Sequence, residues 1–218
     1  MLTLLEQLLD DTELPKMVSI LNAKLDDEHR RREQFYEDLR ADQKAEFING
    51  EVVRHSPAKA KHLKARENLE RLLGTFVAVR QVGEVHSEKA LCSFTRNDYE
   101  PDICFFSETK AASITAETVK FPVPDFAVEV LSDSTERKDR GVKFRDYAAH
   151  AVREYWIIDA DDELVEQYLL KGTAYELRLK SGSGEIESAV VSGFRIPIRA
   201  IFDGEENLRV LRQILTPA

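Results

Sequence analysis

Residues 1–45 carry apolar side chains at helical spacing, which predicts a helical amino-terminal extension. Pro15 stands between two apolar groups and divides this extension into two helices. Residues 26–44 are highly charged and have few apolar positions, so we expect an exposed helix or one that packs on a partner, a candidate dimer contact. The apolar positions that carry the prediction are Leu4, Leu5, Leu8, Leu9, Met17, Val18, Ile20, Leu21 and Leu25.

Residues 47–106 predict a hairpin, a helix and several strands. Asn49-Gly50 between short apolar runs is a strong signal for a two-residue hairpin turn. Ser56 and Pro57 suit the cap and first turn of a helix, whose inner leucines end near Gly74. Strand-like segments follow at residues 76–79, near residue 85, at 90–94 and at 103–106, with a turn at 96–98.

The second half of the chain predicts two buried strands around a helix, followed by hairpins. Residues 125–131 are apolar on both alternating faces, as in a central strand covered on both sides, and residues 154–159 form a second such run. Ser134 or Thr135 can cap a helix that runs to about residue 149. Residues 164–170, 174–179 and 186–191 suggest an antiparallel meander, so the whole order indicates a mixed α/β domain.

Composition and charge narrow the class of protein. The chain has 218 residues, 43% hydrophobic and 33% charged, which fits one folded domain with an extension. A net charge of −9 argues against coating nucleic acid by charge alone, although residues 54–71 and 136–145 are locally basic. Those stretches are equally consistent with solvated helix faces.

Location and redox state follow from what the sequence contains. The apolar runs are far shorter than the roughly 20 residues of a membrane-spanning helix. The first ten residues have no basic leader, so we expect a cytoplasmic protein. Cys92 and Cys104 lack metal-ligand spacing and are interpreted as reduced core thiols.

Glu129 is the strongest chemical anomaly, because it stands between Val128 and Val130 in a strand that otherwise looks fully buried. A buried carboxylate needs a cationic partner or a metal ion. An ion pair or an outward edge position would explain Glu129 alone. Asp102 follows Pro101 at the start of another apolar strand, and if the two strands are neighbours, both carboxylates can bind one Mg²⁺ or Mn²⁺.

Lys143 supplies a cation on the helix that follows the Glu129 strand. An ammonium group there could complement the attacking water or the charge that develops on phosphorus. The alternative is an ordinary surface lysine. Tyr147 lies at i+4 from Lys143 and could brace it or contact phosphate.

These residues together resemble the Uma-two family, a bacterial group of putative restriction endonucleases, widespread in cyanobacteria, with the PD-(D/E)XK nuclease fold. The resemblance covers about residues 45–205. The matching segments, in order, are residues 47–53, Ser56-Pro57 with His62, residues 101–103, residues 124–132, Asp139, Lys143, Tyr147, residues 154–159 and residues 192–198.

The resemblance implies that Asp102 and Glu129 are metal ligands and Lys143 the catalytic lysine. One departure matters: a simple E-x-K motif would place lysine where Leu131 stands, so the lysine role falls to the helix. Glu51 and His62 are weaker supporting candidates, with Glu67 or Glu70 as other possible carboxylates and a surface histidine as the alternative for His62.

The expected fold is α/β with a mixed sheet: a restriction endonuclease-like core with flanking helices, C-terminal antiparallel hairpins and an N-terminal helical extension. We expect the extension over residues 1–45, the nuclease-like domain over 46–206 and a C-terminal tail over 207–218.

The preferred hypothesis is a Mg²⁺- or Mn²⁺-dependent endonuclease that hydrolyses DNA phosphodiester bonds as a homodimer. One alternative is an inactive nucleic-acid or partner-binding module with the same fold. Another is a structural protein with a merely ion-paired carboxylate, which requires Lys143 at salt-bridge distance from Glu129 and no open cleft.

Overall fold

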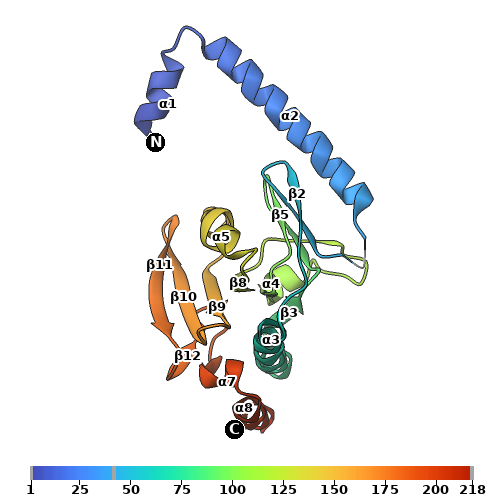
Figure 1. Ribbon diagram of the computed structural model, residues 1–218, viewed down its shortest axis with the longest axis vertical. Helices are drawn as coiled ribbons and strands as arrows, with labels where there is room; N and C mark the ends of the chain where they lie inside the picture. The colour runs from blue at the N-terminus through green and yellow to red at the C-terminus, as the bar shows by residue number, and fades with distance from the viewer. Residues whose placement is uncertain (1, 41–42, 217–218) are drawn as a thin grey trace.

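The amino-terminal helices project from the rest of the chain (Figure 1). The computed structural model describes residues 2–40 and 43–216. Helix α1 (Leu2–Leu9) is followed by the long α2 (Leu14–Asp38), with Pro15 in its first turn as the sequence predicted. Val18, Leu21 and Leu25 on α2 are exposed. The predicted helical extension is therefore present, and its first half keeps an uncovered apolar face.

The second half of α2 packs on the chain's own body. Phe35 is 3% exposed and forms a small core with Ala45, Phe47 and Leu91. Polar contacts reinforce this packing, because the Arg32 guanidinium donates to both carboxylate oxygens of Asp98 at 2.6 and 2.7 Å. The charged segment is thus a packed helix, and the homodimer stays a prediction.

A six-stranded sheet forms the centre of the domain. Its order is β11-β10-β9-β8-β6-β3, antiparallel throughout except for the parallel pair β8 and β9. The predicted central strand is confirmed as β8, in which every residue is buried. The strands are β3 (Gly83–Ser87), β6 (Ile103–Ser107), β8 (Phe126–Val130), β9 (Glu154–Asp159), β10 (Leu164–Lys171) and β11 (Ala174–Ser181).

A five-stranded sheet lies beside it, in the order β2-β1-β5-β4-β7. The hairpin β1–β2 turns at Asn49 and Gly50, whose φ angles of 51° and 85° lie in the left-handed region that this two-residue turn requires. Strands β12 and β13 form a third, two-stranded sheet. The bounds are β1 (Ala45–Ile48), β2 (Glu51–Arg54), β4 (Leu91–Ser93), β5 (Asp98–Tyr99), β7 (Lys120–Phe121), β12 (Glu185–Glu187) and β13 (Arg195–Pro197).

Helices cover the sheets from two sides. Helix α3 (Ala60–Arg80) packs with α7 (Arg199–Phe202) and α8 (Gly204–Leu215) at one end of the molecule (Figure 1). A second helical run comprises α5 (Glu136–Lys138), the π-helical turn η1 (Asp139–Lys143) and α6 (Phe144–Ala149), and the short α4 (Glu108–Ala111) follows β6. Both free thiols, Cys92 and Cys104, are buried as predicted. This is the expected mixed α/β fold.

The predicted bounds of the α3 region are wrong at both ends. The helix begins at Ala60, after the Ser56-Pro57 pair, and it continues through Gly74 to Arg80, so residues 76–79 are helical and form no strand. Phe76 and Val77 extend the buried face of the helix. Burying a phenylalanine contributes about 1.5–3 kcal/mol, whereas an interior glycine costs only about 1 kcal/mol.

The predicted meander is only partly right. Strands β10 and β11 pair as expected, but residues 185–187 pair with β13 rather than extending that sheet. Ile186 lies opposite Ile196, and both are buried in the core, which explains the different partner.

The proposed division at residues 45/46 and 206/207 stays a prediction. Strand β1 begins at Ala45, and α8 spans most of the expected tail while packing on α3. No helix within the described ranges combines the length and apolar character needed to cross a lipid bilayer.

Arg32→Ala should loosen α2 without detaching it and destabilise the protein by about 2–3 kcal/mol, because Asp98 is fully buried and loses its cationic partner. The hydroxyl groups of Tyr36 and Ser93 still donate to Asp98 and limit the loss. Urea unfolding measures the effect. The matched control, Arg30→Ala, removes an exposed guanidinium and should change stability by less than about 0.5 kcal/mol; equal losses in both variants would contradict this account.

Candidate active site

Two buried carboxylates meet where β6 and β8 pair. Ile103 lies opposite Val128 in this antiparallel pair, so the residue before Ile103 stands beside the residue after Val128. These residues are Asp102 and Glu129, which are 6% and 2% exposed. The Val130 amide donates to Asp102 Oδ2 at 2.8 Å, which fixes the carboxylate against β8. The sequence predicted that Asp102 and Glu129 would lie together if their two strands were neighbours. The strands pair, and the two carboxylates are adjacent.

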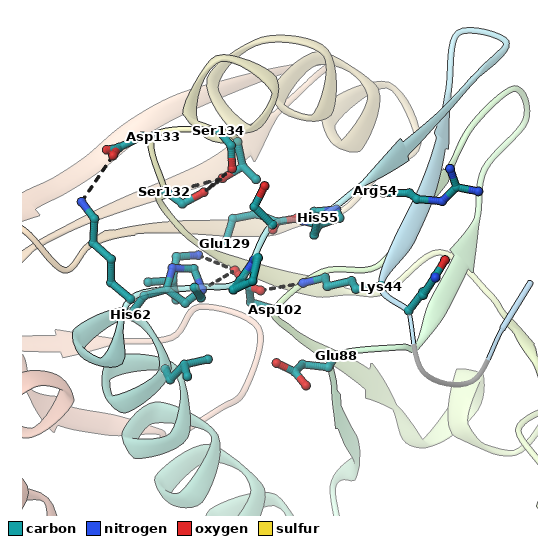
Figure 2. Close-up of a pocket in the computed structure, with 18 residues that line it drawn as sticks. Lys44, Arg54, His55, His62, Glu88, Asp102, Glu129, Ser132, Asp133 and Ser134 are labelled. Carbon is teal, nitrogen blue, oxygen red and sulfur yellow. Dashed lines mark hydrogen bonds and ion pairs between the residues drawn. The ribbon is translucent and has the colours of Figure 1, made fainter.

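Asp102 and Glu129 lie on a cleft of about 650 Å³. Figure 2 shows them close together, with Lys44 reaching Asp102 from one side and His62 of α3 on the other. The remaining walls come from the segment after β2, from the loop after β8 and from Glu88. The cleft thus has a carboxylate floor and several cationic or imidazole side chains on its walls.

Asp102 is held in its ionised form. Burial by itself raises the pKa of this carboxyl, but the charges of Lys44 and His62, with hydrogen bonds from Lys44 and Val130, lower it to about 2. Lys44 Nζ lies 2.7 Å from Oδ1, and His62 Nε2 lies 3.9 Å from Oδ2. Asp102 therefore presents a negative charge at neutral pH.

Glu129, unlike Asp102, favours its protonated form. Burial raises its pKa to about 8, against the opposing charge of Lys143 and with help from Asp139, Asp102 and Glu46. Lys143 Nζ and the Tyr147 hydroxyl both donate to Oε1, at 3.0 and 2.8 Å. Glu129 consequently holds a proton near neutral pH until a further cation favours its ionised form.

Lys143 lies beneath Glu129 and is 1% exposed. Its Nζ is 2.9 Å from Glu46, 3.0 Å from Glu129 and 3.2 Å from Asp139. These carboxylates raise the pKa of Lys143 although burial lowers it. The lysine is absent from the residues that line the cleft. The expectation that its ammonium faces a substrate therefore receives no support, and its contacts instead hold Glu129 in place.

Glu46 and His55 belong to the same network, and sequence reasoning missed both. Glu46 Oε2 lies 3.1 Å from His55 Nε2, and His55 lines the cleft. Burial opposes ionisation of Glu46, but the charges of Lys143 and His55 lower its pKa to about 2. A signal was available, because Glu46 interrupts the apolar strand β1 just as Glu129 interrupts β8. Lys44, at the end of a charged stretch, carried no such signal.

The weaker candidates lie in different places. His62 lines the cleft, and its Nδ1 lies 3.4 Å from the Leu131 carbonyl oxygen. Tyr147 is buried and braces Glu129 rather than Lys143. Glu51 is exposed on β2 and lines a neighbouring groove instead of the cleft. Glu67 and Glu70 border a third hollow on α3.

The donors on the cleft floor suit a hard divalent cation. Mg²⁺ commonly uses one or two carboxylates and completes its shell with water and substrate phosphate. Asp102 is ionised, and both hydrogen bonds that the described residues make to the Glu129 side chain end at Oε1. Within residues 2–40 and 43–216, no group of three or more His, Cys, Asp or Glu side chains is arranged to hold a metal ion. The fit therefore depends on two carboxylates.

The ion-paired structural interpretation is met only in part. Lys143 is at salt-bridge distance from Glu129, as that interpretation requires. That interpretation also requires that there is no open cleft, but Glu129 lines one. Glu129 is therefore paired from below by Lys143, Asp102 is paired from one side by Lys44, and both carboxylates line an open cleft.

Comparisons with known proteins agree with this architecture. A family model described as "Uma2: Putative restriction endonuclease" matches residues 32–199. The chain is 30% identical over 151 residues to the uncharacterized protein sll1609 of Synechocystis sp. (strain ATCC 27184 / PCC 6803 / Kazusa), covering 67% of this chain and 85% of that protein. The 1.96 Å crystal structure of a putative nuclease belonging to DUF820 from Anabaena variabilis ATCC 29413 shares the fold, with a TM-score of 0.67, 17% identity and coverage of 78% of this chain and 96% of that one.

Glu129→Gln should stabilise the metal-free protein at alkaline pH. The pKa of Glu129 is about 8 in the fold against an ordinary 4.5, so the wild type loses stability as pH rises through this range. Glutamine stays neutral and still accepts from Tyr147, so the variant should gain at least about 1 kcal/mol at about pH 8.5 and little at about pH 4.5. Urea unfolding of both proteins checks this, and a parallel fall with pH would contradict the buried-carboxyl account.

Proposed function

The chain belongs to the Uma2 family of putative restriction endonucleases, and from this premise we propose that it is a metal-dependent endonuclease that hydrolyses phosphodiester bonds in DNA. The observation that carries the proposal is the meeting of Asp102 and Glu129 on the floor of an open cleft. Two adjacent carboxylates with cationic side chains around them suit a site for a divalent cation and a phosphate group.

Asp102 and Glu129 would hold Mg²⁺ or Mn²⁺. When bound, such an ion lowers the pKa of a coordinated water and neutralises charge on phosphate oxygens. Asp102 is already ionised, whereas Glu129 must give up its proton. Lys143 and Tyr147 fix Oε1 of Glu129, so the carboxylate keeps its orientation before and after that proton leaves.

Lys44 is the ammonium group best placed to meet a phosphate. It lines the cleft and contacts Asp102, while burial and the opposing charge of Asp102 leave its pKa raised. We therefore assign Lys44 the neutralisation of charge on the scissile phosphate and Lys143 the positioning of Glu129. His62, on the other side of Asp102, can donate a further hydrogen bond to a phosphate oxygen.

The second candidate is a binding module without turnover. It is favoured by one observation: each carboxylate already has an ammonium partner, Lys44 for Asp102 and Lys143 for Glu129. DNA binding without cleavage in either Mg²⁺ or Mn²⁺ would support this module and reject the endonuclease.

Asp102→Asn and Glu129→Gln should each lower Mn²⁺-dependent cleavage by at least about 10²-fold, because each removes charge from the proposed metal site. The measurement is initial cleavage of plasmid and single-stranded DNA by purified protein. Asp133→Asn is the matched control, since Asp133 lines the same cleft but is exposed, and it should retain activity within about threefold. Cleavage that survives in the first two variants would identify a contaminant and reject the assignment.

Lys44→Gln should lower kcat by about 10²-fold, because it removes the cation next to the proposed phosphate position. Lys59→Gln provides the control: Lys59 also lines the cleft, but it is exposed and pairs with Asp133 and Asp161. Its variant should stay within about fivefold of the wild type. If Lys44→Gln keeps the wild-type kcat, the role assigned to Lys44 is wrong and another cation must neutralise the phosphate charge.

A further inference from the structure

A second groove, of about 480 Å³, lies between the end of α2 and the β1–β2 hairpin. Its walls include Arg31 from α2, Arg40 just after α2 and Arg54 at the end of β2. Gln43 and Arg54 line both this groove and the catalytic cleft. The two hollows are therefore neighbours that share a wall.

The charge of the groove is opposite in sign to the net charge of the protein as a whole. Three guanidinium groups line it, against the carboxylates of Asp38 and Glu51, in a chain of net charge −9. Arg40 and Arg54 are exposed, and neither forms an ion pair with any residue that the structure describes. Arg31 pairs with Asp27 at 2.8 Å, at an exposed position. Guanidinium groups that have no ion-pair partner among the described residues, and that lie beside a cleft, are available to an anionic ligand.

We propose that this groove binds the sugar-phosphate backbone of the DNA strand next to the scissile phosphate, an inference that rests on the proposed function. Guanidinium groups match phosphate in shape and charge and are the usual choice for such contacts. Arg54 stands between the cleft and the groove, so a strand leaving the metal site meets Arg54 first and then Arg40. Apolar Leu39 and Val52 also line the groove and can contact sugars.

The groove gives the second half of α2 a function. Arg32 and Glu28 fix this helix on the body through Asp98 and Arg96, so Arg31 is carried on a firmly held element. The matched family region begins at residue 32, and most of α2 precedes it. Of the residues that line the groove, Arg31 alone precedes the matched region, whereas Arg40 and Arg54 lie within it.

The test measures DNA binding by fluorescence anisotropy with labelled single-stranded and duplex DNA in Ca²⁺, with gels confirming that the probe stays intact. The double variant Arg40→Gln with Arg54→Gln should weaken binding about tenfold at about 100 mM salt and reduce the slope of log affinity against log salt by about 1 to 2. The matched control, Arg30→Gln with Arg209→Gln, removes the same charge from exposed positions elsewhere and should change affinity less than about twofold.

Two other outcomes separate the two proposals. If the double variant matches the control in both affinity and salt slope while the wild type still cleaves DNA through Asp102, the groove assignment is overturned and the proposed function stands. If the wild type neither binds nor cleaves either DNA form, the proposed function fails and the groove assignment fails with it. All four arginines are exposed, so circular dichroism should show unchanged folding in every variant.

Discussion

The candidate site depends on one buried ammonium group held by three carboxylates. Lys143 contacts Glu46 of β1, Glu129 of β8 and Asp139 of η1, and so ties both larger sheets to the helical run after β8. Removing charges from water costs several kcal/mol per ion, so such a cluster is weak evidence for stability alone. The desolvation cost of the cluster is explained if the cluster sets the position and protonation of Glu129, the carboxylate that lines the cleft.

Site residues with a local signal could be predicted from the sequence, whereas those that depend on tertiary contacts could not. Glu129 stood out because a charge in an apolar strand is anomalous wherever that strand lies, and pairing of β6 with β8 brought Asp102 beside it. The burial of Lys143 was not visible, because a lysine on a helix reveals nothing about which carboxylates surround it. Lys44 could not be found at all, since its contact with Asp102 joins residues 58 positions apart.

The same distinction explains the errors in the fold. Gly74 suggested a helix end because only local preference was counted, yet the burial of Phe76 and Val77 against the core carries α3 onward to Arg80. The charged α2 looked like a solvent-exposed or partner-packing element, but Arg32 and Phe35 find their partners within the chain. In α3 tertiary contacts outweigh a correct local preference, whereas α2 stays largely exposed, as expected, and packs on the body through few residues.

Calorimetric titration with Mn²⁺ tests the central claim, a metal site built on Asp102 and Glu129, most directly. We expect one site in the wild type and in Asp133→Asn, and loss of that site in Asp102→Asn and Glu129→Gln. We also expect release of the Glu129 proton on binding, seen as a dependence of the heat on buffer ionisation near neutral pH. Unchanged Mn²⁺ binding after loss of either carboxylate would contradict the account.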